Sequence, residues 1–336
     1  MGRPAPHPRS SVVPRFLPAL TVAALAVALV GCAADSEPAP TDTSTPDARE
    51  CTASGPVSDS VKVTGDIGTL PTVEFDAPLE LDETQRTVVI EGDGEPTPYG
   101  SVVTVDYSFY NGTTGEAIES TNFTEGEQAV FVVDETKLLS GLLKTVECTP
   151  VGSRVTGVVP AADAFGDDGL EDYGISGGDS LVFVVDIVDA VTRAWGDPQE
   201  APAGFPTVEL DESGAPSVTI PDDFTLPTTS QSAVLIKGDG AEVAATDSVY
   251  IQYYGLDAET GEVFDQTWDG APYGGSASGF ITGFTNALVG QTVGSQFIVV
   301  IPPAEGYGEA GGDNTSQLAG KTLIFVVDVL AAVPTV

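Results

Sequence analysis

The sequence predicts an α+β protein in which one domain, a twisted antiparallel β-sheet wrapped around one short α-helix, occurs twice in tandem. The first observation is internal repetition: "VVIEGDG" (88–94) returns as "VLIKGDG" (234–240), "VTVDYSFYNGTTGEA" (103–117) as "VYIQYYGLDAETGEV" (249–263), and "LVFVVDIVDAV" (181–191) as "LIFVVDVLAAV" (323–333). The others are strand-like alternation and one helix-like segment in each copy. We expect domains at 61–192 and 205–336, joined by a Pro- and Gly-rich linker at 193–204.

Apolar spacing justifies the strands and the helix of each copy. Val249, Ile251 and Tyr253 alternate with other residues as in a half-buried strand, and "TLIFVVDVL" is a nearly continuous run that suits a strand covered by a helix. The predicted helices carry apolar residues at i, i+3 and i+4: Phe284, Ala287 and Leu288 in the second copy, and Leu139, Leu142, Leu143 and Val146 in the first. Glycines in "VGQTVGS" end the second helix.

The first 60 residues predict export rather than fold. Three Arg precede an apolar run from Phe16 to Val30, which is typical of a signal peptide over 1–31. Leu29, Val30 and Gly31 precede Cys32 in the pattern of a bacterial lipobox, so we expect lipid attachment at Cys32 and localisation on the outer face of the cytoplasmic membrane, on the extracellular side. The alternative is a membrane-spanning helix, but the run is shorter than the ~20 residues needed to span. Residues 32–60, rich in Pro, Thr and acid, predict a flexible tether.

Composition excludes several classes of function. The chain has 12 Lys and Arg against 50 Asp and Glu, and the signal peptide removes three Arg and no acid, so such a surface would repel nucleic acid. The single histidine, His7, lies in the signal peptide, which excludes His-dependent nucleophilic catalysis and His-ligated metal. We expect no cofactor and no metal. Two cysteines remain besides Cys32, and in an oxidising compartment Cys51 and Cys148 are expected to form a disulfide.

An ordered series of motifs in the second copy names a family. "VYIQYYG", "TGEVFD", "GFITGF" with "LVGQTVGSQ", "VVIPPAEGYGEAG" and "TLIFVVDVL" follow one another over about 234–333. Each motif is weak alone, but the series resembles the FKBP-type peptidyl-prolyl cis-trans isomerases. The whole chain is similar to exported actinobacterial lipoproteins with two FKBP-like domains. The resemblance implies rotation of X-Pro bonds in exported, proline-containing polypeptides.

The resemblance also implies a pocket. Its catalytic residues would be Tyr253, Phe264, Asp265, Ile281, Phe284, Tyr307 and Phe325, with Phe280 and Tyr273 binding substrate at the rim. Three features depart from the family: Phe284 stands where Trp is usual, the loop after Tyr307 has no His, and no Lys or Arg occurs between residues 265 and 320 to pair with Asp265. Apart from the resemblance, core packing is the alternative explanation for each of these aromatic residues.

The implied chemistry needs no titrating group. Rotation of an X-Pro bond faces a barrier of ~18–20 kcal/mol set by amide resonance, and no bond breaks. The proline ring would lie on Phe284, the backbone N–H of Ile281 would donate to the substrate carbonyl, and the Tyr307 hydroxyl would bind the neighbouring carbonyl. Asp265 would face the carbon of the twisting carbonyl. Interactions that are stronger in the twisted state lower the barrier.

The first copy differs at most of these positions. It keeps Tyr107 and Phe183 but has Ile118 and Glu119 for Phe264 and Asp265, and Leu139, Leu142 and Phe165 for Ile281, Phe284 and Tyr307. We therefore predict that the first domain is catalytically weak or inactive and serves as a spacer, a docking surface or a chaperone face. Two alternatives for the whole chain stay open: a non-catalytic envelope chaperone, and a surface-binding or spacer lipoprotein.

Overall fold

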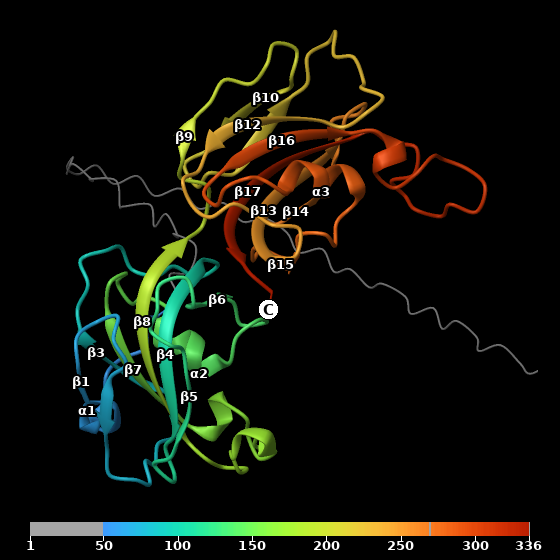
Figure 1. Cartoon of the computed structure of the whole chain (residues 1–336). Helices are drawn as coiled ribbons and strands as arrows, with labels where there is room; N and C mark the ends of the chain where they lie inside the picture. Colours follow the sequence, from blue (N-terminus) through green and yellow to red (C-terminus); the bar gives the residue numbers. More distant parts are fainter. Residues whose placement is uncertain (1–49, 269, 336) are drawn as a thin grey trace, which may run out of the picture. The chain divides into compact units, whose positions relative to one another are not determined.

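The structure, a computed structural model, describes residues 50–268 and 270–335. The predicted signal peptide, the lipidation site Cys32 and most of the predicted tether lie outside these ranges. Within them, no helix has both the length and the apolar character that crossing a bilayer requires. The predicted tandem α+β architecture is confirmed, because two mostly antiparallel sheets follow one another along the described chain, with two short α-helices against the first and one against the second (Figure 1).

The first domain is built on one six-stranded sheet. The strand order is β3-β7-β8-β4-β5, and β6 also pairs with β4. Its elements are α1 (Pro56–Ser60), β1 (Lys62–Thr64), β2 (Thr72–Glu74), β3 (Gln85–Ile90), β4 (Val102–Asn111), β5 (Ala117–Ser120), β6 (Ala129–Val132), α2 (Ser140–Val146), β7 (Arg154–Val159), η1 (Ala161–Asp163), η2 (Glu171–Tyr173) and β8 (Leu181–Val191). The long central strands β4 and β8 pair over ten residues, from Val102 with Val191 to Asn111 with Leu181.

The second domain repeats this sheet with one strand added. The order is β14-β13-β17-β16-β12-β9, and β15 also pairs with β13. Its elements are β9 (Asp197–Pro198), β10 (Thr207–Leu210), β11 (Pro216–Thr219), β12 (Gln231–Lys237), β13 (Ser248–Asp257), β14 (Val263–Gln266), β15 (Tyr273–Ser276), α3 (Thr282–Leu288), β16 (Gln296–Ile301), η3 (Pro303–Glu305) and β17 (Leu323–Val333). The added strand β9 comes from the predicted linker, so part of that linker belongs to the second sheet.

Each helix packs on one face of its sheet because its apolar residues recur at helical spacing. In the second domain Phe284, Ala287 and Leu288 are buried against Phe297 and Phe325, which point to the same face of neighbouring strands. The helix ends at Leu288 and is capped by Val289, and the next residue, Gly290, has a φ of 88°, in the left-handed region that favours glycine. In the first domain Leu143 and Val146 of α2 are buried in the same way. Both predicted helices are therefore present.

The opposite face of each sheet is covered by the chain segment that precedes it. The hairpin of β1 and β2 packs on the first sheet, and the hairpin of β10 and β11 packs on the second, where Val208 and Val218 contact buried Ile298 and Ile324. The two hairpins differ in topology. The "PTVE" segment forms the second strand of the first hairpin but the first strand of the second hairpin.

The predicted tether ends earlier than the sequence suggested. Residues 50–60 are part of the first domain, because Cys51 forms a disulfide with Cys148 at an S–S distance of 2.06 Å. The amide of Val57 in α1 also donates to the side-chain oxygen of Gln85, at 3.0 Å. The disulfide is the one predicted from the two cysteines that remain besides Cys32, whereas the contact between Val57 and Gln85 leaves no sign in the acidic, Pro-rich composition, because the two residues lie far apart along the chain.

A buried carboxylate stands at the same place in each sheet, with different partners. Asp186 of β8 forms a bidentate ion pair with fully buried Arg154, at 2.6 and 2.7 Å. Its counterpart Asp328 of β17 accepts instead from Gln296, at 2.7 Å, and from the backbone N–H of Ala194, at 2.7 Å. Burial, without a bonded cation to offset it, raises the pKa of Asp328 to about 6.

Candidate functional site

A cavity of about 320 Å³ opens between α3 and the concave face of the second sheet. All nine residues that the sequence assigned to the pocket line it. The lining is Tyr253, Phe264, Asp265, Tyr273, Gly279, Phe280, Ile281, Phe284, Tyr307 and Phe325. Gly279 is the one lining residue that the sequence analysis did not single out. The residues come from β13, β14, β15, α3, β17 and the loops beside α3 and η3, so segments from residue 253 to residue 325 assemble the cavity.

The floor of the cavity is aromatic and almost fully buried. Phe284 and Phe325 are 3% and 6% exposed, and their rings meet edge to face with centroids 5.2 Å apart. Phe280 stacks on Phe284 with centroids 4.5 Å apart, which extends the apolar surface from the floor to the rim. A phenylalanine at the position of the family's usual tryptophan therefore keeps the floor aromatic.

One wall depends on a glycine that makes room for a ring. Phe264 of β14 meets Phe325 edge to face, with centroids 5.5 Å apart. Gly255, on the neighbouring strand β13, has no side chain in this space. A Cβ at Gly255 would lie 2.8 Å from the ring of Phe325 and 2.9 Å from the ring of Phe264. Gly255 thus contributes to the pocket because it has no side chain that would occupy the space of the two rings. The spacing of residues along one strand does not reveal this role, because the rings belong to neighbouring strands.

The polar edge of the cavity is a tyrosine hydrogen-bonded to an acid. The Tyr253 hydroxyl donates to a carboxylate oxygen of Asp265 at 2.6 Å. Burial, and then the hydrogen bond to Asp265, raise the pKa of Tyr253 well above its ordinary value, so the hydroxyl keeps its proton. The sequence left Asp265 without a basic partner, and the structure shows that a neutral phenol takes this place.

Two further polar groups belong to residues that line the cavity. Ile281 precedes the first turn of α3, and within the described ranges no protein acceptor is recorded for its backbone N–H. Tyr307 is 41% exposed and follows η3. The side-chain amide of Asn314 donates to the backbone carbonyl of Tyr307 at 2.8 Å, which fixes the loop that carries the tyrosine. The cavity therefore has an apolar floor and hydrogen-bonding groups at its rim.

The first domain has a corresponding cavity of about 250 Å³ that is almost entirely apolar. It is lined by Val105, Tyr107, Phe109, Ala129, Phe131, Leu139, Leu142, Phe165, Phe183 and Val185. Leu142 and Leu139 take the places of Phe284 and Ile281, as the sequence predicted. Phe165 takes the place of Tyr307, so this rim lacks that hydroxyl.

The sequence comparison missed how the first pocket keeps its aromatic wall. Ile118 replaces Phe264, but Phe109 of β4 stacks on Phe183 with centroids 5.4 Å apart. Phe109 occupies the position of Gly255, so the ring comes from β4 in one domain and from β14 in the other. Phe131 of β6 adds a second ring to this pocket, and the sequence analysis did not predict it.

The tyrosine–acid pair is present in both pockets. The Tyr107 hydroxyl donates to Glu119 at 2.5 Å, as Tyr253 does to Asp265. The replacement of Asp265 by Glu119 therefore keeps the contact between tyrosine and acid, because the longer Glu119 reaches the corresponding phenol. What the first pocket lacks is the Tyr307 hydroxyl and the aromatic floor of Phe284. Among the described residues, no cluster of His, Cys, Asp and Glu could hold a metal ion.

Comparison with known proteins places both domains in one family. The sequence profile of the FKBP-type peptidyl-prolyl cis-trans isomerases matches residues 94–188 and 240–330. A probable FK506-binding protein of Corynebacterium glutamicum is 34% identical over 128 residues, 38% of this chain and 98% of that protein. An FK506-binding protein of Streptomyces anulatus is 35% identical over 98 residues, which are 28% of this chain and 79% of that protein. The alignment with the crystal structure of the three FKBP domains of wheat FKBP73 covers 75% of this chain and 95% of the wheat chain. The sequence identity is 20% and the TM-score is 0.33.

Proposed function

Because the chain belongs to the family of FKBP-type peptidyl-prolyl cis-trans isomerases, we propose that it catalyses this reaction in its second domain, on proline-containing segments of exported polypeptides. The observation that carries the proposal is the cavity over Phe284 and Phe325. It combines a buried aromatic floor with the Tyr307 hydroxyl and the N–H of Ile281 at its rim. The first domain has no such combination.

The proposed mechanism follows from the surroundings of the bound amide. The proline ring lies on Phe284, with Phe325, Phe264 and Tyr253 around it. This water-poor surface favours the twisted amide, whose dipole is smaller, over the planar amide, which water solvates better. No proton or electron pair leaves the substrate. The enzyme acts by binding the twisted state more tightly than the planar one.

Three polar groups orient the substrate. The N–H of Ile281 donates to a carbonyl oxygen of the substrate. The Tyr307 hydroxyl donates to the neighbouring carbonyl oxygen. The Asp265 carboxylate faces the carbon of the twisting carbonyl. The hydrogen bond from Tyr253 holds that carboxylate in place at 2.6 Å and spreads its charge. Asp265 with the neutral Tyr253 hydroxyl therefore takes the role that an acid paired with an arginine has elsewhere in the family.

The first domain is proposed to bind apolar segments without catalysing rotation. Its cavity offers the rings of Phe109, Phe131 and Phe183 but no rim hydroxyl in place of Tyr307. Such a pocket holds an apolar side chain without distinguishing the planar from the twisted amide. This division retains the chaperone alternative for one domain and assigns the enzyme activity to the other.

The localisation is a separate proposal that rests on the sequence before residue 33. Cys32 is proposed to carry a lipid that anchors the chain at the outer face of the cytoplasmic membrane, on the extracellular side. Labelling cells with an alkyne fatty acid tests this. Label on the unaltered chain and none on Cys32→Ala is expected, whereas equal labelling of both would contradict the anchor.

The activity is tested on the whole chain with matched variants. The rate of cis-trans isomerisation of an X-Pro peptide is measured for the unaltered protein, for Phe264→Ala, and for the first-domain counterpart Ile118→Ala. We expect Phe264→Ala to lower kcat/KM about tenfold, equivalent to ~1.4 kcal/mol of transition-state stabilisation, and Ile118→Ala to leave it unchanged. Equal losses would show that both pockets catalyse, and no activity in the unaltered protein would overturn the proposal.

A further inference from the structure

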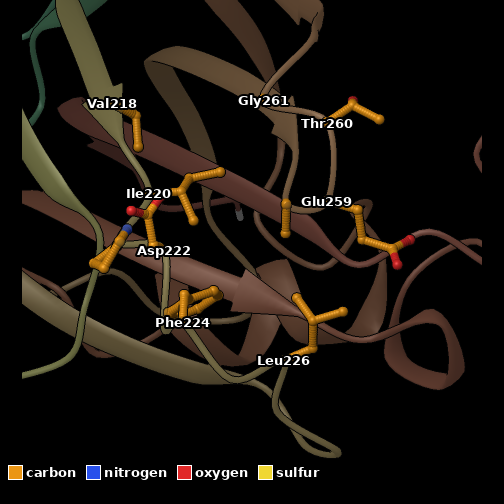
Figure 2. Close-up of a pocket in the computed structure, with 10 residues that line it drawn as sticks. Val218, Ile220, Asp222, Phe224, Leu226, Glu259, Thr260 and Gly261 are labelled. Atoms are coloured by element: carbon orange, nitrogen blue, oxygen red, sulfur yellow. The ribbon is translucent and has the colours of Figure 1, made fainter.

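A second cavity of the second domain lies on the face of the sheet opposite the proline pocket. It has a volume of about 520 Å³ and is shown in Figure 2. Its apolar side is formed by Val218, Ile220, Phe224 and Leu226, which come from the segment covering the sheet, and by Ala258 from the turn after β13. Asp222 and Glu259 stand at separate parts of its rim (Figure 2).

The first domain shows what fills the corresponding place. The turn at residues 111–116 is the counterpart of the turn at 257–262, and each is closed by the same backbone bond, from Gly115 to Asn111 and from Gly261 to Asp257, at 2.8 Å. In the first domain an extended piece of chain lies against this turn. The backbone N–H of Leu79 donates to the carbonyl of Gly112 at 2.9 Å, and the Ser180 hydroxyl donates to the carbonyl of Leu79 at 2.7 Å.

Leu79 also fills the place sterically. It is 8% exposed and packs with Val158 and Val182 on the same face of the sheet. One extended segment therefore supplies both a backbone hydrogen bond to the turn and a buried aliphatic side chain.

In the second domain the chain takes another route and leaves the place open. The corresponding segment first forms β11 and then passes through Asp222 and Leu226, and Leu226 stays 37% exposed. Within the described ranges, no protein donor is recorded for the carbonyl of Ala258, the counterpart of Gly112. Thr322, which accepts from the N–H of Ala258 at 2.9 Å, keeps a hydroxyl at the position of Ser180. The acceptor and the hydroxyl remain, but the segment around Leu79 that uses them in the first domain has no counterpart at this place in the described part of the second.

The charge at the rim adds a requirement for the occupant. Asp222 and Glu259 are exposed carboxylates that line the cavity, and Glu262 follows in the same turn. The nearby Lys321 is bound to Asp257 at 2.8 Å, and so it offsets only part of this charge. A basic side chain beside the aliphatic one complements such a rim.

We propose that this cavity is a second peptide-binding site, which takes an extended segment with a leucine-like side chain next to a Lys or Arg. The aliphatic side chain lies on Ile220, Phe224 and Leu226. The peptide N–H donates to the carbonyl of Ala258, as that of Leu79 does to Gly112. The site faces away from the proline pocket, so a client chain is held by one face of the domain while the other face acts on a proline.

A fluorescent peptide without proline tests this site separately from isomerase activity. The probe is fluorescein-Ala-Lys-Leu-Lys-Ala, titrated with the full chain at low salt and followed by anisotropy. Saturable binding is expected, and it should be lost when the peptide Leu is replaced by Ser and weakened when its Lys residues are replaced by Glu. The double variant Asp222→Lys/Glu259→Lys should bind about fivefold more weakly, because it replaces both carboxylates that attract the peptide's Lys residues with like charges.

Two controls separate this site from the rest of the chain. Thr113→Lys places the same charge at the counterpart of Glu259 in the first domain, where Leu79 already fills the site, and should leave binding unchanged. The double variant should keep the isomerase rate of the unaltered chain, since neither residue touches the proline pocket.

Several results would overturn the proposal. They are equal binding by the double variant, displacement of the probe by an X-Pro peptide, and no saturable binding at all. Sedimentation velocity of the same proteins checks for a second copy as the occupant. Self-association of the unaltered chain that disappears in the double variant would assign the face to a dimer instead.

Discussion

The two pockets of this chain share a sheet and a tyrosine–acid pair but obtain their aromatic wall from different strands. Phe264 on β14 forms it in the second domain, and Phe109 on β4 forms it in the first, where the facing residue is Ile118. The comparison shows that the volume of the cavity can survive while its rim chemistry changes. A pocket that stays apolar but loses the hydroxyl of Tyr307 is suited to holding a chain, and the complete pocket is suited to rotating it.

The largest effect is expected from removing the floor of each pocket. Phe284→Ala should destabilise the second domain by about 3–5 kcal/mol and abolish isomerase activity, because it removes a ring that is 3% exposed. Leu142→Ala in the first domain should cost about 1–3 kcal/mol of stability, since the side chain is only partly buried, and leave the isomerase rate unchanged. Calorimetry and a peptide assay on the full chain measure the two effects. Loss of activity in Leu142→Ala would contradict the assignment.

A second large difference concerns the buried carboxylates. The pKa of Asp328 is raised to about 6 from an ordinary value of 3.8, so the second domain binds the proton more tightly when folded. The stability contributed by this proton is fully present below about pH 4 and is lost as the pH rises through 6, with a total near 3 kcal/mol.

Two variants sharpen this prediction. Asp328→Asn should remove this component of the pH dependence of unfolding between pH 4 and 7. Gln296→Arg should also reduce it, because it supplies the cation that Arg154 supplies to Asp186 at 2.6 Å. Chemical denaturation across this pH range provides the measurement. An unchanged pH profile in Asp328→Asn would show that another group titrates.

Moving the aromatic wall between strands tests the comparison itself. Gly255→Phe should destabilise the second domain by about 1–3 kcal/mol, because its Cβ would lie 2.8 Å from Phe325 and 2.9 Å from Phe264. Adding Phe264→Ile, which reproduces the Phe109 and Ile118 of the first domain, should recover most of that stability. Thermal unfolding of the single and double variants measures the two changes in stability. If the double variant is no more stable than Gly255→Phe, the two aromatic walls are not interchangeable.

The smallest effect is expected at the rim. Tyr307→Phe should lower kcat/KM about fivefold, since one neutral hydrogen bond contributes roughly 1 kcal/mol. The reciprocal change Phe165→Tyr should give the first domain no measurable activity, because Leu142 still replaces the aromatic floor. Steady-state kinetics of the full chain in a background of Phe284→Ala shows whether Phe165→Tyr adds any rate. A gain there would place the functional difference at the rim alone.

Much of the fold and the list of pocket residues could be predicted from the sequence, because both depend on local patterns. The repeats predicted two similar sheets in tandem, and the i, i+3, i+4 spacing of Phe284, Ala287 and Leu288 located α3. All nine residues assigned to the pocket line one cavity. They could be assigned because the motifs follow the order of the family, so each motif residue matches a known pocket position.

The remaining features depend on contacts between distant segments. Phe109 substitutes for Phe264 only because Gly255 and Asp265 are paired across β13 and β14, and alignment of the two copies cannot show that pairing. The partner of Asp265 could not be predicted because it is a phenol on the neighbouring strand β13, 12 residues away, rather than a basic residue. The cavity behind the sheet was missed as well, because residues 211–230 have no periodic pattern to locate them.

The tyrosine–acid pair gives the most direct test of the division between the domains, since it is present in both at 2.6 and 2.5 Å. Exchange NMR spectroscopy of an X-Pro peptide is recorded with the unaltered chain, with Tyr253→Ala/Asp265→Ala, and with Tyr107→Ala/Glu119→Ala. The account predicts that cis-trans exchange falls to the uncatalysed rate only when Tyr253 and Asp265 are replaced. Exchange that persists in that variant and disappears in the first-domain variant would contradict it.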